Sequence, residues 1–223
     1  PYGKADIKVP WELSRFQHLT ILGEGYWLTH NETYTKEFIN QINDWIDKNK
    51  PKGGVNWLCT MDVAIRACNW IIGYSYFKGS SEITDEFLFR FLKSLYQHGT
   101  HIMANLEWSD DITSNHYLSN IVGLVYIGIM FPEFKEANKW KDFGIKQLIT
   151  EMEKQVYQDG CDFEASTCYH RLVMELFFFT SAFVVINDED FNGINHKEIT
   201  EKIFGKKYTA KLYKMFEATL YLL

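Results

Sequence analysis

Apolar residues recur every three or four positions through most of this chain. In segment 33–49, Phe38, Ile42 and Trp45 fall on one helical face, and Pro51 follows shortly after as a stop signal. Polar residues occupy the opposite face, which is typical of an amphipathic helix. The pattern therefore predicts a helix here that is buried on one side only.

The same pattern extends along the whole chain. It predicts helices at 11–18, 19–29, 33–49, 57–77, 84–105, 116–131, 133–158, 163–186, 196–204 and 208–223. Segments 57–77, 116–131 and 163–186 are apolar on nearly all sides, and amphipathic segments separate them. Buried and amphipathic helices in alternation favour an all-α fold of two layers, an α/α toroid whose inner helices line a cleft.

Composition supports this fold class. The chain has 223 residues, of which 46% are hydrophobic and 17% aromatic, with only 14 Gly and 4 Pro. So few turn residues disfavour a sandwich or barrel, and the length suits one domain spanning residues 1–223. The net charge of −6 predicts no general attraction to nucleic acid or to anionic membranes, and no apolar run is expected to span a bilayer. An acidic substrate would have to be recognised locally.

Cysteines do not point to a disulfide scaffold or a metal site. The 4 cysteines are few for a chain of this length. Cys161, Asp162, Cys168 and His170 lie close in sequence, but their spacing matches no standard zinc pattern. We therefore expect free thiols, no metal and no cofactor.

The segment SNHYLSNIVG at 114–123 carries the first candidate site. Ser114 is a good helix N-cap, which places Asn115 and His116 in the first turn. Free backbone N–H groups and the positive end of the helix dipole suit this position to an anion. The Asn115 amide adds a donor without a competing charge. The alternative is that both residues only help to cap the helix.

The second candidate lies in GCDFEASTCYHRLVMEL at 160–176. After a turn at Asp159-Gly160, we expect Asp162 to cap the next helix and Glu164 to lie in its first turn. Tyr169, His170 and Arg171 then bring a phenol, an imidazole and a guanidinium together at the start of a buried helix. The alternative is a helix end with a satisfied Tyr169 and an ion pair between Arg171 and Glu175.

Asn115 and Tyr169 each begin a buried helix, with one amphipathic helix between them. Consecutive inner helices of a ring would present both starts to the same cleft. This pairing indicates β-elimination on a uronic acid, in which donors neutralise the carboxylate so that the C5 proton can leave. A tyrosine can remove that proton and protonate the leaving oxygen if positive charge lowers its pKa from about 10. His170 and Arg171 are candidates for supplying that charge.

Three blocks resemble heparinase II/III-type polysaccharide lyases. They are VPWELSRFQH at 9–18, NWLCTMDVAIRACNW at 56–70, and segments 115–123 and 159–175 taken together. The resemblance implies that Asn115 neutralises the uronate and that Tyr169, followed by His170, acts as base and acid. It also implies an acidic polysaccharide substrate, a bacterial source and a periplasmic or secreted location.

In that family the toroid is joined to a C-terminal β-sheet domain, and a further catalytic histidine lies beyond the toroid. We therefore expect residues 1–223 to be an incomplete toroid, truncated at its C-terminus, with the β-sheet domain of the same parent chain as its partner. On this expectation the fragment alone can be inactive.

The block at 56–70 adds two candidate substrate contacts. Trp57 offers a ring for sugar stacking, and Arg66 offers a bidentate fork for a carboxylate. His116, His170 and Arg171 join them as residues expected to orient substrate. The alternatives are that Trp57 is a core residue and that Arg66 forms a structural ion pair with Asp62, one turn earlier.

Two other functions remain open at the level of sequence. A glycoside hydrolase on a helical ring would need two carboxylates, and candidates exist at Glu107, Asp110, Asp111, Asp162 and Glu164. A non-catalytic polysaccharide-binding module would keep the aromatic and arginine contacts without needing the Tyr169 hydroxyl. The sequence does not distinguish endo from exo cleavage, nor one uronate polymer from another.

Overall fold

The computed structural model describes residues 6–51, 53–191 and 195–222. Over these residues it is all-α, as predicted, and its one strand-like feature is an isolated bridge between Val156 and Asp162. The chain packs as two compact units, residues 1–105 and 106–223. That residues 1–223 form one domain stays a prediction.

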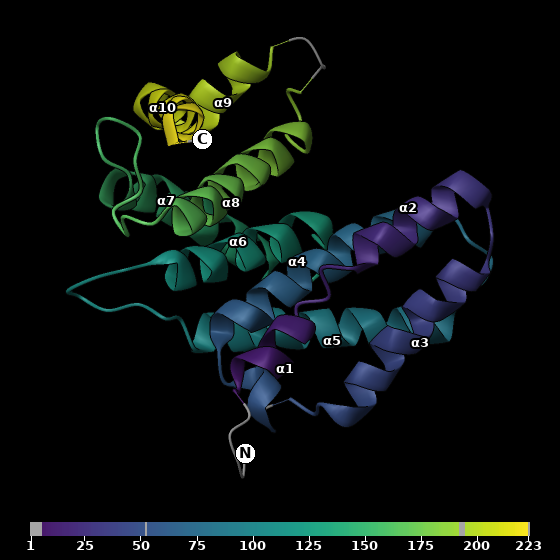
Figure 1. Cartoon of the computed structure of the whole chain (residues 1–223). Coiled ribbons are helices and arrows are strands. Elements are labelled where there is room, and N and C mark those ends of the chain that lie inside the picture. The colour runs from purple at the N-terminus through teal and green to yellow at the C-terminus, as the bar shows by residue number, and fades with distance from the viewer. Residues whose placement is uncertain (1–5, 52, 192–194, 223) are drawn as a thin grey trace. The chain divides into compact units, whose positions relative to one another are not determined.

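The described residues of unit 1 form five α-helices and one 3-10 turn (Figure 1). They are α1 (Lys8–Leu13), α2 (Leu19–Thr29), α3 (Thr33–Lys48), η1 (Val55–Trp57), α4 (Thr60–Phe77) and α5 (Asp85–Ala104). Helix α4 packs against both α2 and α5, and α3 packs against the same two helices. The helix predicted at 57–77 starts at Thr60, because residues 55–57 form the separate turn η1.

Aromatic side chains fill the core of unit 1. Phe38 stacks on Phe77 with ring centroids 4.7 Å apart, and Trp70 meets Trp45 edge-on at 5.3 Å. Phe38, Phe77 and Trp70 are fully buried. Each such side chain stabilises the fold by about 1.5–3 kcal/mol through its burial. Phe38, Trp45, Trp70 and Phe77 are therefore core positions, as the spacing of 33–49 and 57–77 predicts.

Unit 2 contains α6 (Asn115–Met130), α7 (Ala137–Gln155), α8 (Thr167–Ile186), α9 (His196–Phe204) and α10 (Lys206–Leu222). Helix α6 packs against α7 and α8, and α10 packs against α7, α8 and α9 (Figure 1). Leu118, Ile121 and Leu124 are fully buried, because α6 has neighbours on several sides. This central place explains why α6 is apolar all round.

Helix α8 is long and apolar enough to cross a membrane by length and composition, with a mean hydropathy of 1.4 over its most apolar window. The expectation that no run reaches this length is therefore wrong. Of that window, 39% is buried inside the structure, where α6, α9 and α10 pack against α8. A core helix passes the same test of length and composition.

Candidate active site

The start of α6 is built as a rigid, capped helix end. The Ser114 side chain accepts from the His116 backbone N–H, which confirms the predicted N-cap. A buried network supports this end from α7. The fully buried Glu151 carboxylate accepts from the Thr113 hydroxyl and, at 2.7 Å, from the Gln155 amide. Because Gln155 also donates to the Ser114 carbonyl at 3.3 Å, α7 holds the first turn of α6 in place.

The start of α8 differs from the sequence expectation. Ser166, not Asp162, is its N-cap, and the Ser166 hydroxyl accepts from the Tyr169 backbone N–H. The helix thus begins at Thr167, and Tyr169 lies in its first turn. Glu164 lies in the preceding loop. Pattern alone missed this because 163–166 contains a second good capping residue, and the structure uses the later one.

The Tyr169 side chain is open to solvent. It is 47% exposed, and no described residue hydrogen-bonds to its hydroxyl. A phenol at this place is accessible to a substrate and belongs to a residue in the first helical turn. This geometry suits an acid or base.

One carboxylate connects the two helix starts. Glu164 Oε1 accepts from the Asn115 backbone N–H at 3.0 Å and from the Asn115 side-chain amide at 2.8 Å. Glu164 Oε2 accepts from the same amide at 2.9 Å. Asn115 is only 4% exposed, so these bonds lie in a largely dry environment. The start of α6 therefore holds a carboxylate, the chemical group for which it was singled out.

The loop between α7 and α8 carries Glu164 and is itself fixed at several points. Asp162 Oδ2 accepts from the Glu164 backbone N–H at 3.1 Å, while its own N–H donates to His170 Nδ1 at 3.2 Å. Burial raises the pKa of Asp162 to about 6, and the negative charge of Glu164 adds to this rise. Ala165, directly after Glu164, has a φ of 53°, which is unusual for a residue with a Cβ.

His170 lies inside unit 2 rather than in a cleft. Its side chain is buried, Nδ1 accepts from Asp162, and Nε2 lies 3.2 Å from the Met215 carbonyl and 3.1 Å from the Thr219 hydroxyl. Both ring nitrogens are thus used to join the loop and α8 to α10. The expectation that His170 contacts substrate does not fit this burial.

His116 and Arg171 are both exposed, as substrate contacts need to be. His116 Nδ1 lies 3.0 Å from Glu107 Oε1, and Glu107 Oε2 in turn accepts from Asn120 at 3.1 Å. The described residues include no ion pair between Arg171 and Glu175. Arg171 therefore remains available as a cation two residues from Tyr169.

Arg66 belongs to unit 1 and lies in its core. Its guanidinium is fully buried, donates to His98 Nε2 at 2.9 Å and to the Asn56 carbonyl at 3.2 Å, and covers the Trp45 ring at 4.1 Å. Burial lowers the pKa of Arg66 to about 9. Asp62, its expected ion-pair partner, instead accepts from Arg15 at 2.6 Å.

Trp57 is likewise a core residue, only 3% exposed, and its indole N–H donates to the Asn49 carbonyl at 3.0 Å. Burial leaves neither Trp57 nor Arg66 free to bind a sugar. We therefore leave both out of the proposed substrate contacts. Sequence reasoning failed here because a tryptophan or an arginine at helical spacing looks the same in a core as in a cleft.

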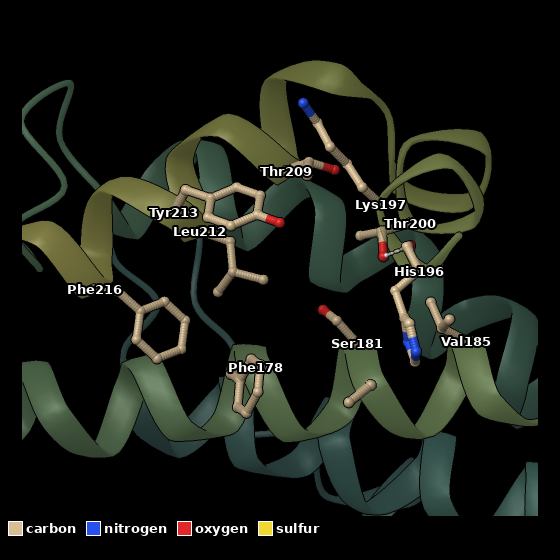
Figure 2. Close-up of a pocket in the computed structure, with 11 residues that line it drawn as sticks. Phe178, Ser181, Val185, His196, Lys197, Thr200, Thr209, Leu212, Tyr213 and Phe216 are labelled. Carbon is tan, nitrogen blue, oxygen red and sulfur yellow. Dashed lines mark hydrogen bonds between the residues drawn. The ribbon is translucent and has the colours of Figure 1, made fainter. Parts of the chain in front are cut away.

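A separate apolar cavity of about 150 Å³ lies between α8 and the pair α9 and α10 (Figure 2). Phe178 and Ser181 of α8 face Leu212, Tyr213 and Phe216 of α10 across it. None of the candidate residues lines this cavity. It is therefore not the candidate site.

The comparisons with known proteins agree with this architecture. The family model for the heparinase II/III N-terminus matches residues 3–223. A heparin-sulfate lyase of Pedobacter heparinus is 31% identical over 177 residues, which cover 77% of this chain and 26% of that protein. A heparin-sulfate lyase of Bacteroides stercoris is 31% identical over 193 residues, covering 77% of this chain and 28% of the relative.

Solved structures show the same likeness. The crystal structure of heparan sulfate lyase from Pedobacter heparinus matches 99% of this chain and 33% of its own length, with a TM-score of 0.73 and 27% identity. A heparinase III gene product matches 98% of this chain and 35% of its own, with a TM-score of 0.74 and 28% identity. These neighbours confirm the predicted fold class, the N-terminal part of an α/α toroid.

The chain spans about a quarter of the length of the curated relatives it matches. The family model nevertheless covers both units, including the start of α6 and the start of α8. The chain therefore belongs to the heparinase II/III family and corresponds to the N-terminal part of its lyases.

Proposed function

We propose that the protein containing this chain is a lyase that cleaves a uronic-acid polysaccharide by β-elimination. The observation that carries the proposal is the start of α6, where a backbone N–H and the amide of Asn115 bind a carboxylate within the protein. Groups that bind a carboxylate in this way also stabilise the charge that develops on a uronate when its C5 proton leaves. Because the relatives are named heparin-sulfate lyases, a heparan-like polymer is the first substrate to test.

Tyr169 is the proposed base and acid. As a phenolate it takes the proton from C5, and the electron pair left on C5 is stabilised through the carboxylate that Asn115 binds. The pair then forms the C4–C5 double bond as the C4–O4 bond breaks, and the Tyr169 hydroxyl protonates the departing oxygen. The phenolate is restored, so the cycle needs no oxidant or cofactor.

The neighbouring basic side chains support binding of an acidic polymer. Arg171 is exposed and follows Tyr169 by two residues in α8, and His116 is exposed in the first turn of α6. We propose that both orient the anionic polymer. Local basic groups fit recognition of an acidic glycan by a chain whose net charge is −6.

The experiment is to incubate the complete protein with heparan sulfate, hyaluronan, alginate and a glucuronan, and to follow near-ultraviolet absorbance and new reducing ends together. Elimination produces a conjugated unsaturated uronate, so both signals rise on at least one polymer. Reducing ends without absorbance would instead establish hydrolysis. Binding without either signal would identify a carbohydrate-binding module.

A further inference from the structure

Glu164 has no lyase role in the sequence analysis, yet its carboxylate makes three hydrogen bonds to Asn115. Its two carboxylate oxygens receive three hydrogen bonds from Asn115, at 2.8, 2.9 and 3.0 Å. It lies five residues before Tyr169, in the loop that leads into α8. A single side chain therefore ties the proposed neutraliser to the segment that carries the proposed base.

The contact fixes which end of the Asn115 amide faces Glu164. A carboxylate only accepts hydrogen bonds, so the NH2 group must point toward it and Oδ1 away. Asn115 Oδ1 is buried and has no hydrogen-bond partner among the described residues. Nothing besides Glu164 therefore selects this orientation. A flipped amide would present an oxygen to an incoming carboxylate and repel it.

The same geometry leaves one donor for a substrate. The oxygens of a carboxylate are only about 2.2 Å apart, so from Nδ2 they lie in nearly one direction, whereas the two amide N–H bonds diverge by about 120°. One N–H thus serves both Glu164 oxygens. The second N–H has no acceptor among the described residues, and under the proposed function it is the donor that would bind a uronate carboxylate.

Glu164 is in turn held by its own loop. Its backbone N–H donates to Asp162 Oδ2 at 3.1 Å, and Asp162 bonds to His170 of α8. A continuous series of hydrogen bonds thus runs from the start of α6 through Glu164 and Asp162 to α8. Its function is to keep two catalytic groups on different helices at a fixed separation.

We propose that Glu164 is a positioning residue, which orients the Asn115 amide for the uronate carboxylate and aligns the starts of α6 and α8. This inference rests on the proposed function for its kinetic consequence, but the contact itself can be tested without turnover. Glu164 does not touch the reacting atoms and acts through Asn115.

The kinetic test uses Glu164→Ala and Glu164→Gln in the complete protein, with Glu175→Gln as a matched control because Glu175 is an exposed carboxylate farther along α8. A misplaced or flipped Asn115 lowers kcat by about 100-fold in Glu164→Ala, with a smaller change in KM. Glutamine keeps an acceptor at the Oε1 position, so Glu164→Gln retains activity within about tenfold of wild type. The control variant keeps wild-type kcat.

A double-mutant cycle separates positioning from simple stability. Because Glu164 acts through Asn115, adding Glu164→Ala to Asn115→Ala lowers kcat no further. Additive losses would overturn the proposal, as would a Glu164→Ala protein that melts earlier but turns over normally while folded. Faster turnover in Glu164→Ala would also overturn it, since Glu164 would then be blocking the site.

A second readout holds whatever the enzyme's activity proves to be. In wild type the Asn115 backbone N–H donates a hydrogen bond to Glu164. If this contact exists in solution, exchange of that N–H becomes at least about tenfold faster in Glu164→Ala. Unchanged exchange would refute the contact and the inference with it. If exchange is faster in Glu164→Ala but the wild-type protein cleaves no uronate polymer, the contact is confirmed and the proposed function is refuted.

Discussion

Replacing Gly160 with alanine tests how the loop before Tyr169 is held. Gly160 is buried, has a φ of 93°, and follows the turn in which its N–H donates to the Tyr157 carbonyl at 3.1 Å. An L-residue at such an angle costs about 1–2 kcal/mol. The first part of the expected loss is therefore conformational and does not depend on neighbours.

The second part comes from contact with α10. A Cβ on Gly160 would lie 2.3 Å from the backbone oxygen of Lys214 and 2.4 Å from its carbonyl carbon. Backbone atoms within a helix cannot rotate away as a side chain can, and relieving such overpacking costs about 1–3 kcal/mol. We expect Gly160→Ala to lower the free energy of unfolding of unit 2 by about 2–5 kcal/mol in total, and to lower activity by moving the loop that carries Glu164.

Two other glycines provide matched controls. Gly205 has a φ of 88° with no atom within 4 Å of its added Cβ, so Gly205→Ala reports the conformational cost alone, about 1–2 kcal/mol. Gly79 also has open space and no positive φ, so Gly79→Ala should change stability by less than about 0.5 kcal/mol. Native-state hydrogen exchange on the complete protein measures all three locally. A loss in Gly160→Ala no larger than in Gly205→Ala would refute the packing argument.

Three further predictions concern buried polar groups. Burial raises the pKa of Asp162 in the folded protein, so wild type should lose up to about 2–3 kcal/mol of unfolding free energy as the pH rises from about 4 to 6. Asp162→Asn removes this titration, so the variant should lose less unfolding free energy between pH 4 and pH 7, as measured by urea unfolding at both pH values. Glu151→Ala should lower the free energy of unfolding by about 2–4 kcal/mol and speed hydrogen exchange at the start of α6, because Thr113 and Gln155 lose their acceptor. Wild-type exchange rates at the start of α6 in this variant would contradict the network. Arg66→Ala should cost about 3 kcal/mol in unfolding free energy without changing substrate KM in the folded protein, and a large rise in KM would restore Arg66 as a substrate contact.

Helices were predictable from the sequence because their apolar spacing reflects local geometry. The helix predicted at 196–204 has those bounds in the structure, and Ser114 caps α6 as expected. Helix starts were less secure where two capping residues compete, as at Asp162 and Ser166. In that region His170 of α8 contacts Met215 and Thr219 of α10, which lie 45 and 49 positions away, and local spacing does not reveal such long-range contacts.

The candidate site was predictable only in part for a related reason. Asn115 and Tyr169 could be singled out as candidates because each lies at the start of an apolar helix, which is a local signal. Glu164 was noted only as a first-turn residue and as a possible hydrolase carboxylate, since no local pattern shows that its side chain reaches across to α6. Arg66 and His170 were taken for substrate contacts because side-chain type reveals chemistry but not burial. A signal for His170 existed in its apolar surroundings at Val173 and Phe177.

The most direct test of the central claim measures the rate of unsaturated product formation at saturating heparan sulfate. It compares the complete wild-type protein with its Tyr169→Phe and Asn115→Ala variants. Phenylalanine keeps the ring of a 47% exposed side chain, so Tyr169→Phe should fold and bind polymer normally. The account predicts loss of turnover by more than about 1000-fold in Tyr169→Phe and by about 100-fold or more in Asn115→Ala. Wild-type turnover in both folded variants would contradict the assignment of base, acid and neutraliser to these two residues.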